Sequence, residues 1–184
     1  MPKLGMEPIR RAALVKATIA EVGDAGSLDV AVSRIAKRAG MSSGLAHHYF
    51  GGKDEIFAAA MRQILTDYRA EVTTALRRTP DRATAVIEAS FAPSCFAPET
   101  VAAWMTFYAQ AHTSPPALRL LRIYQRRLRS TLTHALRGQV DDPRAAAETL
   151  AALIDGTYLA MAFGHVPGGT ARVLSVLHSL RGQS

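Results

Sequence analysis

Four hydrogen-bonding side chains gather within seven residues of this sequence, and they are Ser43, His47, His48 and Tyr49. Hydroxyl and imidazole groups can donate and accept hydrogen bonds, which is the chemistry needed to read base edges in the DNA major groove. Gly44 lies among them and lets the backbone approach a ligand closely. The segment is therefore a candidate for contact with DNA.

The flanking residues predict two short helices around a tight turn. Gly40 offers the left-handed backbone that ends a first helix, whose apolar positions are Ile35, Ala36 and Ala39. Ser42 is a good N-cap for a second helix from about Ser43 to Tyr49. Two helices joined by a short turn with a glycine describe the helix-turn-helix unit, which lays its second helix in the major groove. An ordinary helical hairpin in a core is the alternative, but it would not need so polar a second helix.

The run from Val32 to Lys53 resembles the signature of TetR-type repressors, in which the helix-turn-helix ends in an aromatic residue, a phenylalanine and a nearby lysine. Three further stretches are similar to the BetI group of that family, whose members repress choline-to-glycine-betaine genes, and they are residues 2–11, 103–108 and 151–159. The resemblance runs over nearly the whole chain and is thinnest between residues 79 and 98.

The resemblance implies an all-α fold of about nine helices. It implies an N-terminal three-helix DNA-binding domain over residues 1–53, with the motif at 31–50 and a connecting helix at 53–78. A helical ligand-binding and dimerisation domain would cover residues 54–184. The expected protein is a homodimeric repressor without a cofactor, which a small-molecule inducer releases from double-stranded operator DNA.

The residues expected at DNA are polar or basic, with one glycine, and they are Ser33, Arg34, Lys37, Ser42, Ser43, Gly44, His47, His48, Tyr49 and Lys53. We expect Tyr49 and Lys53 on phosphates, and Ser43, His47 and His48 on base edges. Ala31 stands where the family usually has Thr or Ser, so no DNA contact is assigned there. Either Ser33 caps a shortened helix or the cap is missing.

Composition sets the broad class. The chain of 184 residues suits one domain, or a small head on a larger body, and a hydrophobic content of 48% is ample for a core. No apolar stretch reaches the roughly 18–20 residues of a membrane span, and the N-terminus lacks a signal-peptide core. The single cysteine, Cys95, excludes an internal disulfide and fits a reducing cytoplasm. A small, partly buried side chain is a simpler role for it than a nucleophile.

The net charge of +7 favours a polyanionic partner, although charge alone would equally suit a membrane surface. Its distribution favours nucleic acid, because residues 1–53 hold eight Lys or Arg against four acidic residues. Besides Arg34, Lys37 and Lys53, the basic residues expected on phosphates are Lys3, Arg10, Arg11, Lys16 and Arg38.

A second basic stretch has arginines at positions 119, 122, 126, 127 and 129, and no acidic residue occurs from 100 to 140. It could be another nucleic-acid surface. However, a regular spacing on the opposite side favours a solvated basic face on a core-packed helix, and its members are Leu118, Leu121, Gln125, Leu128, Leu132 and Ala135.

The remaining chain predicts further helices. The first helix should run from about Glu7 to Val22, with Gly23 and Gly26 breaking it. After the connecting helix, glycines and prolines bound predicted helices at about 81–91, 99–112, 116–137, 143–163 and 170–180.

The last two predicted helices carry a wide apolar surface, made of Leu150, Leu153, Ile154, Thr157, Met161, Ala162, Val173, Val176, Leu177 and Leu180. An isolated helix pair could not cover all of it from one side. The resemblance implies that these helices pair with their symmetry mates in a four-helix bundle, and a two-fold dimer can read a palindromic operator. Core packing within the monomer is the alternative for individual residues.

An enzyme is the contrasting class. The sequence has no phosphate loop, nucleophile elbow or paired-carboxylate motif. His47 and His48 are neighbours and point about 100° apart on a helix, so they do not form a metal pair. The other histidines have no partner at metal-site spacing, and they are His112, His134, His165 and His178. We expect neither catalysis nor a metal.

The candidate effector site consists of Trp104, Phe107, Tyr108, Tyr124, Asp155 and Tyr158. A quaternary ammonium cannot donate hydrogen bonds, so aromatic faces and a carboxylate recognise it. Choline, or a related quaternary ammonium, is the expected inducer. The alternatives are core aromatics beside a polar dimer interface, and, because Phe91 is not followed by acidic residues, a larger or less charged inducer for an efflux or other metabolic operon.

Overall fold

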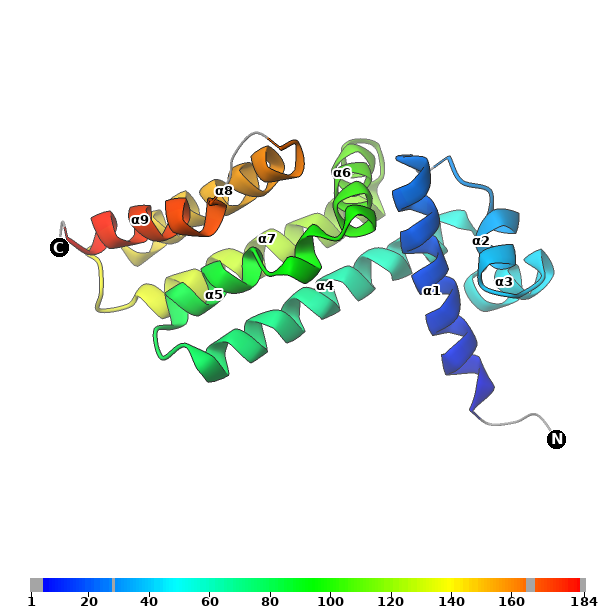
Figure 1. The fold of residues 1–184 in the computed structure, drawn as a ribbon, viewed down its shortest axis with the longest axis horizontal. Helices are drawn as coiled ribbons and strands as arrows, with labels where there is room; N and C mark the ends of the chain where they lie inside the picture. Colours follow the sequence, from blue (N-terminus) through cyan, green and yellow to red (C-terminus); the bar gives the residue numbers. More distant parts are fainter. Residues whose placement is uncertain (1–4, 28, 165–167, 183–184) are drawn as a thin grey trace. The chain divides into compact units, whose positions relative to one another are not determined.

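The computed structural model describes residues 5–27, 29–164 and 168–182, and within these ranges all regular structure is helical (Figure 1). The elements are α1 (Met6–Ala25), α2 (Val32–Arg38), α3 (Ser43–Phe50), α4 (Lys53–Arg78), α5 (Arg82–Ser90), the 3₁₀ helix η1 (Pro93–Phe96), α6 (Pro98–Thr113), α7 (Pro115–Leu136), α8 (Pro143–Ala162) and α9 (Gly169–Arg181). The all-α prediction is confirmed. Two residues named above, Lys3 and His165, lie outside the described ranges.

The chain divides into two compact units. Unit 1 comprises Met1–Thr66 with Ala97–Arg119, and unit 2 comprises Asp67–Phe96 with Leu120–Ser184. The division falls inside α4 and inside α7, so α6 belongs with the N-terminal helices. The sequence-based limits, 1–53 for DNA binding and 54–184 for ligand binding and dimerisation, describe functional domains and remain a prediction.

Unit 1 is built on α1, which packs against α6, α2 and α3. The side chains of Leu14, Ile35 and Ile56 are completely buried. They come from α1, α2 and α4, so each of these helices contributes to the buried interior of unit 1.

The predicted break of the first helix at Gly23 is wrong, because α1 continues to Ala25. A Cβ at Gly23 would lie 2.5 Å from the Glu99 Cα of α6. The glycine therefore serves close packing between two helices rather than a turn. The helix ends at Gly26, which has a left-handed φ of 59°.

Unit 2 has its core between α5, α7, α8 and α9, with Leu132, Leu136, Leu150 and Leu177 completely buried. Five members of the wide apolar surface are buried in this chain's own core, namely Leu150, Ile154, Thr157, Val173 and Leu177. For these residues the monomer-core alternative is the correct one. Leu153, Met161, Val176 and Leu180 are only partly buried against that core.

The other helices lie close to their predicted limits, and their caps explain two of the starts. Asp142 accepts hydrogen bonds from the Arg144 and Ala145 backbone N–H groups at 2.9 and 3.1 Å, with Pro143 in the first turn of α8. Asp81 caps α5, and its two carboxylate oxygens also accept hydrogen bonds from the two terminal nitrogens of Arg181, each at 2.8 Å. The hydrogen bonds from Arg181 lower the pKa of Asp81 to about 2.

Candidate DNA-binding surface and effector site

The turn between α2 and α3 has the predicted geometry. Gly40 has a left-handed φ of 69°, and the Ser42 hydroxyl accepts a hydrogen bond from the Leu45 N–H at 3.3 Å. Ala31, in contrast, makes no side-chain cap at the start of α2, so of the two possibilities stated for this helix, the missing cap is correct. Ala46 and Phe50 are buried and anchor α3 to the core.

The other side of α3 is polar and open. Gly44, His47 and His48 are exposed, while Ser43 and Tyr49 are partly buried. Two apolar residues hold this helix on the core, and its other side exposes two imidazoles and a glycine. The helix can therefore enter a DNA groove without any unfolding of the protein. Ser33, Arg34, Lys37 and Ser42 are also exposed.

His47 is oriented by the end of its own helix. Its Nδ1 lies 3.1 Å from the Gly51 carbonyl oxygen. A carbonyl only accepts, so this contact assigns the proton to Nδ1. Nε2 makes no hydrogen bond within the described part of the chain and is left for an external partner.

Two arginines of α1 hold the C-terminal end of α3. Arg11 donates to the Tyr49 carbonyl oxygen, and its guanidinium lies 4.4 Å from the centre of the Phe50 ring. Arg10 donates to the Tyr49 hydroxyl at 3.4 Å. These side chains, expected on phosphates, therefore also position the residue expected to contact a phosphate.

Acidic residues of α1 engage two of the basic residues of α2. The Glu21 carboxylate pairs with Arg34 at 3.0 Å and with Arg38 at 3.2 Å, and only 10% of the Glu21 side chain is exposed. Asp24 also pairs with Arg38, at 2.7 Å, and this hydrogen bond raises the pKa of Arg38. These pairs hold α2 on α1, a role that the sequence reasoning missed because the partners are distant in the chain.

Lys53 lies at the N-terminus of α4, 3.4 Å from the Asp29 carboxylate and 5.8 Å from the centre of the Phe57 ring. Because Asp29 is almost fully exposed, this pair is weak and leaves the ammonium available to a phosphate.

The six residues of the candidate effector site fall into two sets, one in each unit. In unit 1, the Trp104 ring packs edge-on against Phe107 and at an angle on Tyr108, with ring centres 5.8 and 5.7 Å apart. Trp104 and Phe107 are buried. Phe107 borders a small apolar hollow together with Val22 and Phe57, so it has a packing role in unit 1.

In unit 2, the structure does bring Tyr124 and Asp155 together, because the phenol donates to Asp155 Oδ1 at 3.2 Å. Burial raises the pKa of Asp155, against the hydrogen bond from Tyr124 and the charge of Arg129. Tyr158 donates to the Cys95 carbonyl oxygen at 2.8 Å and lies against the Phe96 ring, with centres 4.9 Å apart.

Further aromatic residues extend this cluster. Phe91 stacks on Phe96 with ring centres 6.2 Å apart, and Tyr68 meets Tyr124 edge-on at 6.0 Å. The Tyr68 hydroxyl is hydrogen-bonded to Ser90, and burial raises its pKa to about 12. Sequence reasoning used Phe91 only for the residues that follow it, and it did not name Tyr68 or Phe96. Phe96 was missed because η1, which places it, has no helical periodicity to reveal it. Cys95 is a partly buried residue whose thiol has its pKa raised by burial.

The arginine stretch on α7 is exposed at every one of its five positions, and four members of the opposite side, Leu121, Leu128, Leu132 and Ala135, are buried. This arrangement agrees with a basic face on a core-packed helix. The salt bridges found among the described residues include none of these arginines.

Comparison with known proteins places this geometry in a family. The family of BetI-type transcriptional repressors, C-terminal, matches residues 80–180, and the bacterial regulatory proteins of the tetR family match residues 14–60. The HTH-type transcriptional regulator BetI of Brucella anthropi is 48% identical over 169 residues, which are 89% of this chain and 87% of the relative. The chain belongs to the TetR family. It is a transcriptional repressor of that type and not an enzyme.

Solved structures agree with this fold of the TetR family. A protein from Pseudomonas aeruginosa PAO1 described as a transcriptional regulator superposes with a TM-score of 0.84 at 26% identity, covering 98% of this chain and 93% of that one. Another so described, from Saccharomonospora viridis and solved in complex with choline, gives 0.78 at 18% identity, with coverages of 92% and 93%. None of the helices in the described ranges has the length and hydropathy to span a membrane.

Proposed function

We propose that this TetR-type repressor reads its operator through the polar side of α3, defined by Ser43, Gly44, His47 and His48, and is released by a quaternary ammonium such as choline. The observation that carries the first part is the polar, open side of a helix whose other side is anchored by Ala46 and Phe50. Base edges would meet the two histidines, and phosphates would meet Tyr49 and Lys53.

We propose a homodimer formed through α8 and α9. Family members typically dimerise, and the partly buried Leu153, Met161, Val176 and Leu180 would complete their burial against a second copy. Two copies would present two α3 helices to the half-sites of a palindrome. This proposal no longer uses the residues buried in the chain's own core.

The inducer proposal rests on unit 2. Asp155 offers a half-buried carboxylate beside Tyr124, and Tyr158 on the same helix adds an aromatic face. Such groups suit a cation that cannot donate hydrogen bonds. The regulator from Saccharomonospora viridis binds choline, and the relatives named BetI add further support.

Ligand binding would weaken operator affinity by the ligand's preference between two conformations of the repressor. Trp104, Phe107 and Tyr108 belong to unit 1, and their part in ligand binding is a separate hypothesis. Replacing Trp104 with Ala should cost about 1–2 kcal/mol of choline binding if its ring contacts a desolvated cation, and isothermal titration would measure this. An unchanged affinity would confine the site to unit 2.

The direct test of the function is gel-shift competition of the purified protein on its own upstream DNA against random duplex, at low and moderate salt. We expect sequence-preferring binding that persists at the higher salt. Equal competition by random duplex would contradict the operator proposal. No heat at millimolar choline, with operator binding intact, would remove choline and favour the alternative, a repressor of an efflux or other metabolic operon with a larger or less charged ligand.

A further inference from the structure

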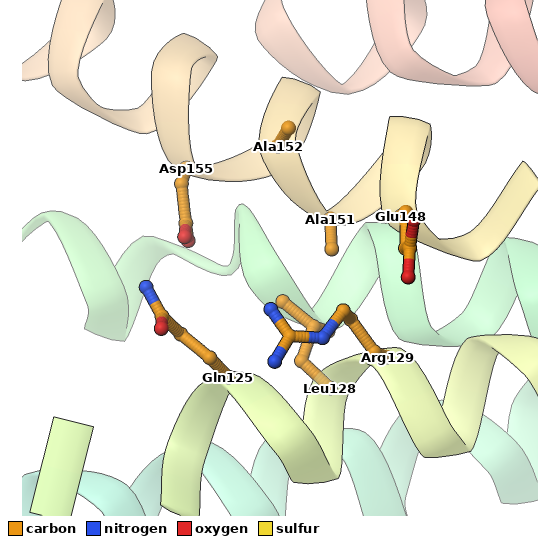
Figure 2. Close-up of a pocket in the computed structure, with 7 residues that line it drawn as sticks. All are labelled: Gln125, Leu128, Arg129, Glu148, Ala151, Ala152 and Asp155. Atoms are coloured by element: carbon orange, nitrogen blue, oxygen red, sulfur yellow. The ribbon is translucent and has the colours of Figure 1, made fainter. Parts of the chain in front are cut away.

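A pocket of about 340 Å³ opens between α7 and α8 in unit 2, a volume within the usual range for small-molecule sites. Its lining residues are Gln125, Leu128 and Arg129 of α7, and Glu148, Ala151, Ala152 and Asp155 of α8 (Figure 2). Of these seven, only Asp155 was singled out from the sequence as a ligand residue. The pocket brings that carboxylate together with other charged groups.

The charged residues of the lining are of both signs, with Arg129 on α7 and Glu148 and Asp155 on α8. Glu148 and Asp155 are two helical turns apart, so they lie on the same side of α8. The guanidinium of Arg129 lies between these two residues in Figure 2, and the Gln125 amide points toward Asp155. No ion pair within the described part of the chain involves Arg129, Glu148 or Asp155.

The hydrogen-bonding capacity of these groups is only partly used. Tyr124 donates to Asp155 Oδ1 at 3.2 Å, and Oδ2 accepts no hydrogen bond within the described ranges. A guanidinium has five N–H donors and no acceptor, so a ligand group facing Arg129 must accept hydrogen bonds. Carboxylates fit that fork best, through paired charge-assisted hydrogen bonds.

These features favour a ligand with both charges over a ligand with only one. A ligand with only a positive charge would be repelled by Arg129, and a ligand with only a negative charge would be repelled by Glu148 and Asp155. The apolar lining comes from Leu128, Ala151 and Ala152, which can take methyl groups but make no hydrogen bonds. A molecule that carries both charges, with methyl groups around its cation, has a partner in Arg129, in Asp155 and in the apolar residues.

We infer that this pocket binds a small zwitterion, a quaternary ammonium ion that also carries a carboxylate, with Arg129 on the carboxylate and Asp155 facing the cation. This inference rests on the proposed function, since it takes a quaternary ammonium as the effector, and it deepens that function by naming the second group of the ligand. Arg129 is then the residue that distinguishes a carboxylated ligand from choline.

The pocket side of α8 differs from the side proposed for the dimer. At about 100° per residue, Leu153 and Met161 lie away from Glu148, Ala152 and Asp155 around the helix axis. Occupation of the pocket by a second copy of the chain is the competing explanation, and it makes ligand affinity depend on protein concentration.

Isothermal titration of the full-length protein with three probes tests the inference. The probes are trimethylglycine, which carries both charges, choline, which lacks the carboxylate, and 3,3-dimethylbutanoate, in which a carbon replaces the charged nitrogen. We expect trimethylglycine to bind about tenfold more tightly than either of the others, because only it engages both Arg129 and Asp155. Equal binding of dimethylbutanoate, or affinity that falls as protein concentration rises, would overturn the inference.

Arg129→Gln should weaken trimethylglycine about tenfold while changing choline affinity by less than about threefold, because the lost bonds go to the carboxylate alone. Arg126→Gln is the matched control, since Arg126 is exposed on the same helix and does not line the pocket. Arg129→Lys keeps the positive charge but loses the paired N–H donors of the guanidinium. Its affinity for trimethylglycine should lie between those of the unmodified protein and Arg129→Gln, which provides a readout if the Gln variant folds poorly. An unchanged preference for trimethylglycine in these Arg129 variants would overturn the inference.

Operator binding by the unmodified protein is measured in parallel. Sequence-preferring binding with no heat from any probe would contradict the zwitterion inference and leave the repressor in place. Absence of sequence-preferring binding would instead contradict the operator proposal, whatever the titrations show.

Discussion

In unit 1, the buried carboxylate of Glu21 is shared by Arg34 and Arg38, at 3.0 and 3.2 Å. In unit 2, the half-buried carboxylate of Asp155 accepts a hydrogen bond from a phenol, while Arg129 borders the same pocket without an ion pair in the described structure. The first arrangement is closed, because cations of the protein already neutralise the acid. The second retains capacity for a charged ligand. The difference separates charges that hold helices together from charges that can bind an effector.

The largest effect is expected from glycines that lie inside helices of the two units. Gly23→Ala should destabilise the protein by about 1–3 kcal/mol, because its Cβ would overlap the Glu99 backbone and the neighbouring helix must shift. Gly156→Ala in α8 is the matched control, since its added Cβ would have no described atom within 4 Å beyond its chain neighbours and the backbone of its own helix. Alanine has a higher helix propensity than glycine, so the Gly156→Ala variant should be more stable than the unmodified protein by about 0.5–1 kcal/mol. Urea unfolding measures both, and changes of the same sign would contradict the assignment of Gly23 to close packing.

The closed arrangement of unit 1 is broken by Glu21→Gln. We expect a loss of about 1–3 kcal/mol in unfolding free energy, because two arginines lose a buried carboxylate. Operator affinity should fall as well, since α2 would be held less firmly. Asp24→Asn is the control, because Asp24 is exposed and its pair with Arg38 should contribute little. Equal losses in the two variants would show that burial of Glu21 is not what matters.

Unit 2 also contains a closed pair, Asp81 with Arg181, and its pH dependence sharpens the comparison. The folded-state pKa of Asp81 is lowered from 3.8 to about 2, so the pair stabilises the protein above the unfolded value. That contribution, about 1–2 kcal/mol, is lost as pH falls from about 4 toward 2. Asp81→Asn retains a capping oxygen for α5 and should differ from the unmodified protein at pH 7. The gap should narrow near pH 2.5, and a gap that does not depend on pH would contradict the ionic origin.

The smallest change concerns DNA. Lys53→Ala should weaken binding to all sequences and reduce the slope of log affinity against log salt by about one unit, as for one lost phosphate contact. His47→Ala should instead alter the preference among operator variants, because its Nε2 is the group left for a base edge. Fluorescence anisotropy at several salt concentrations distinguishes the two. Similar behaviour of both variants would refute this division of roles.

The sequence predicted the helix-turn-helix well because its signals are local. Gly40 and Ser42 each act within one helical turn, and both have the predicted roles in the structure. Tyr124 and Asp155 were grouped correctly by chemistry, and the structure brings them into contact. Their part in ligand binding stays a prediction.

The features that sequence reasoning missed depend on contacts between distant residues. From the sequence, Gly23 was interpreted as a helix breaker, because nothing local shows that the Glu99 backbone of α6 packs against it. Asp81 and Arg181 are 100 residues apart, and Arg129 read only as part of a solvated face. No local propensity encodes which carboxylate a given arginine will meet, so closed and open arrangements look alike in the sequence.

The most direct test of the account is a choline titration of the preformed complex with operator DNA, comparing the unmodified protein with Asp155→Asn. We expect choline to release the unmodified protein at millimolar concentration. The variant should bind the same operator and require at least about tenfold more choline, because a neutral amide cannot balance the cation. Release of both proteins at the same choline concentration would contradict the claim that the open carboxylate of unit 2 senses the effector.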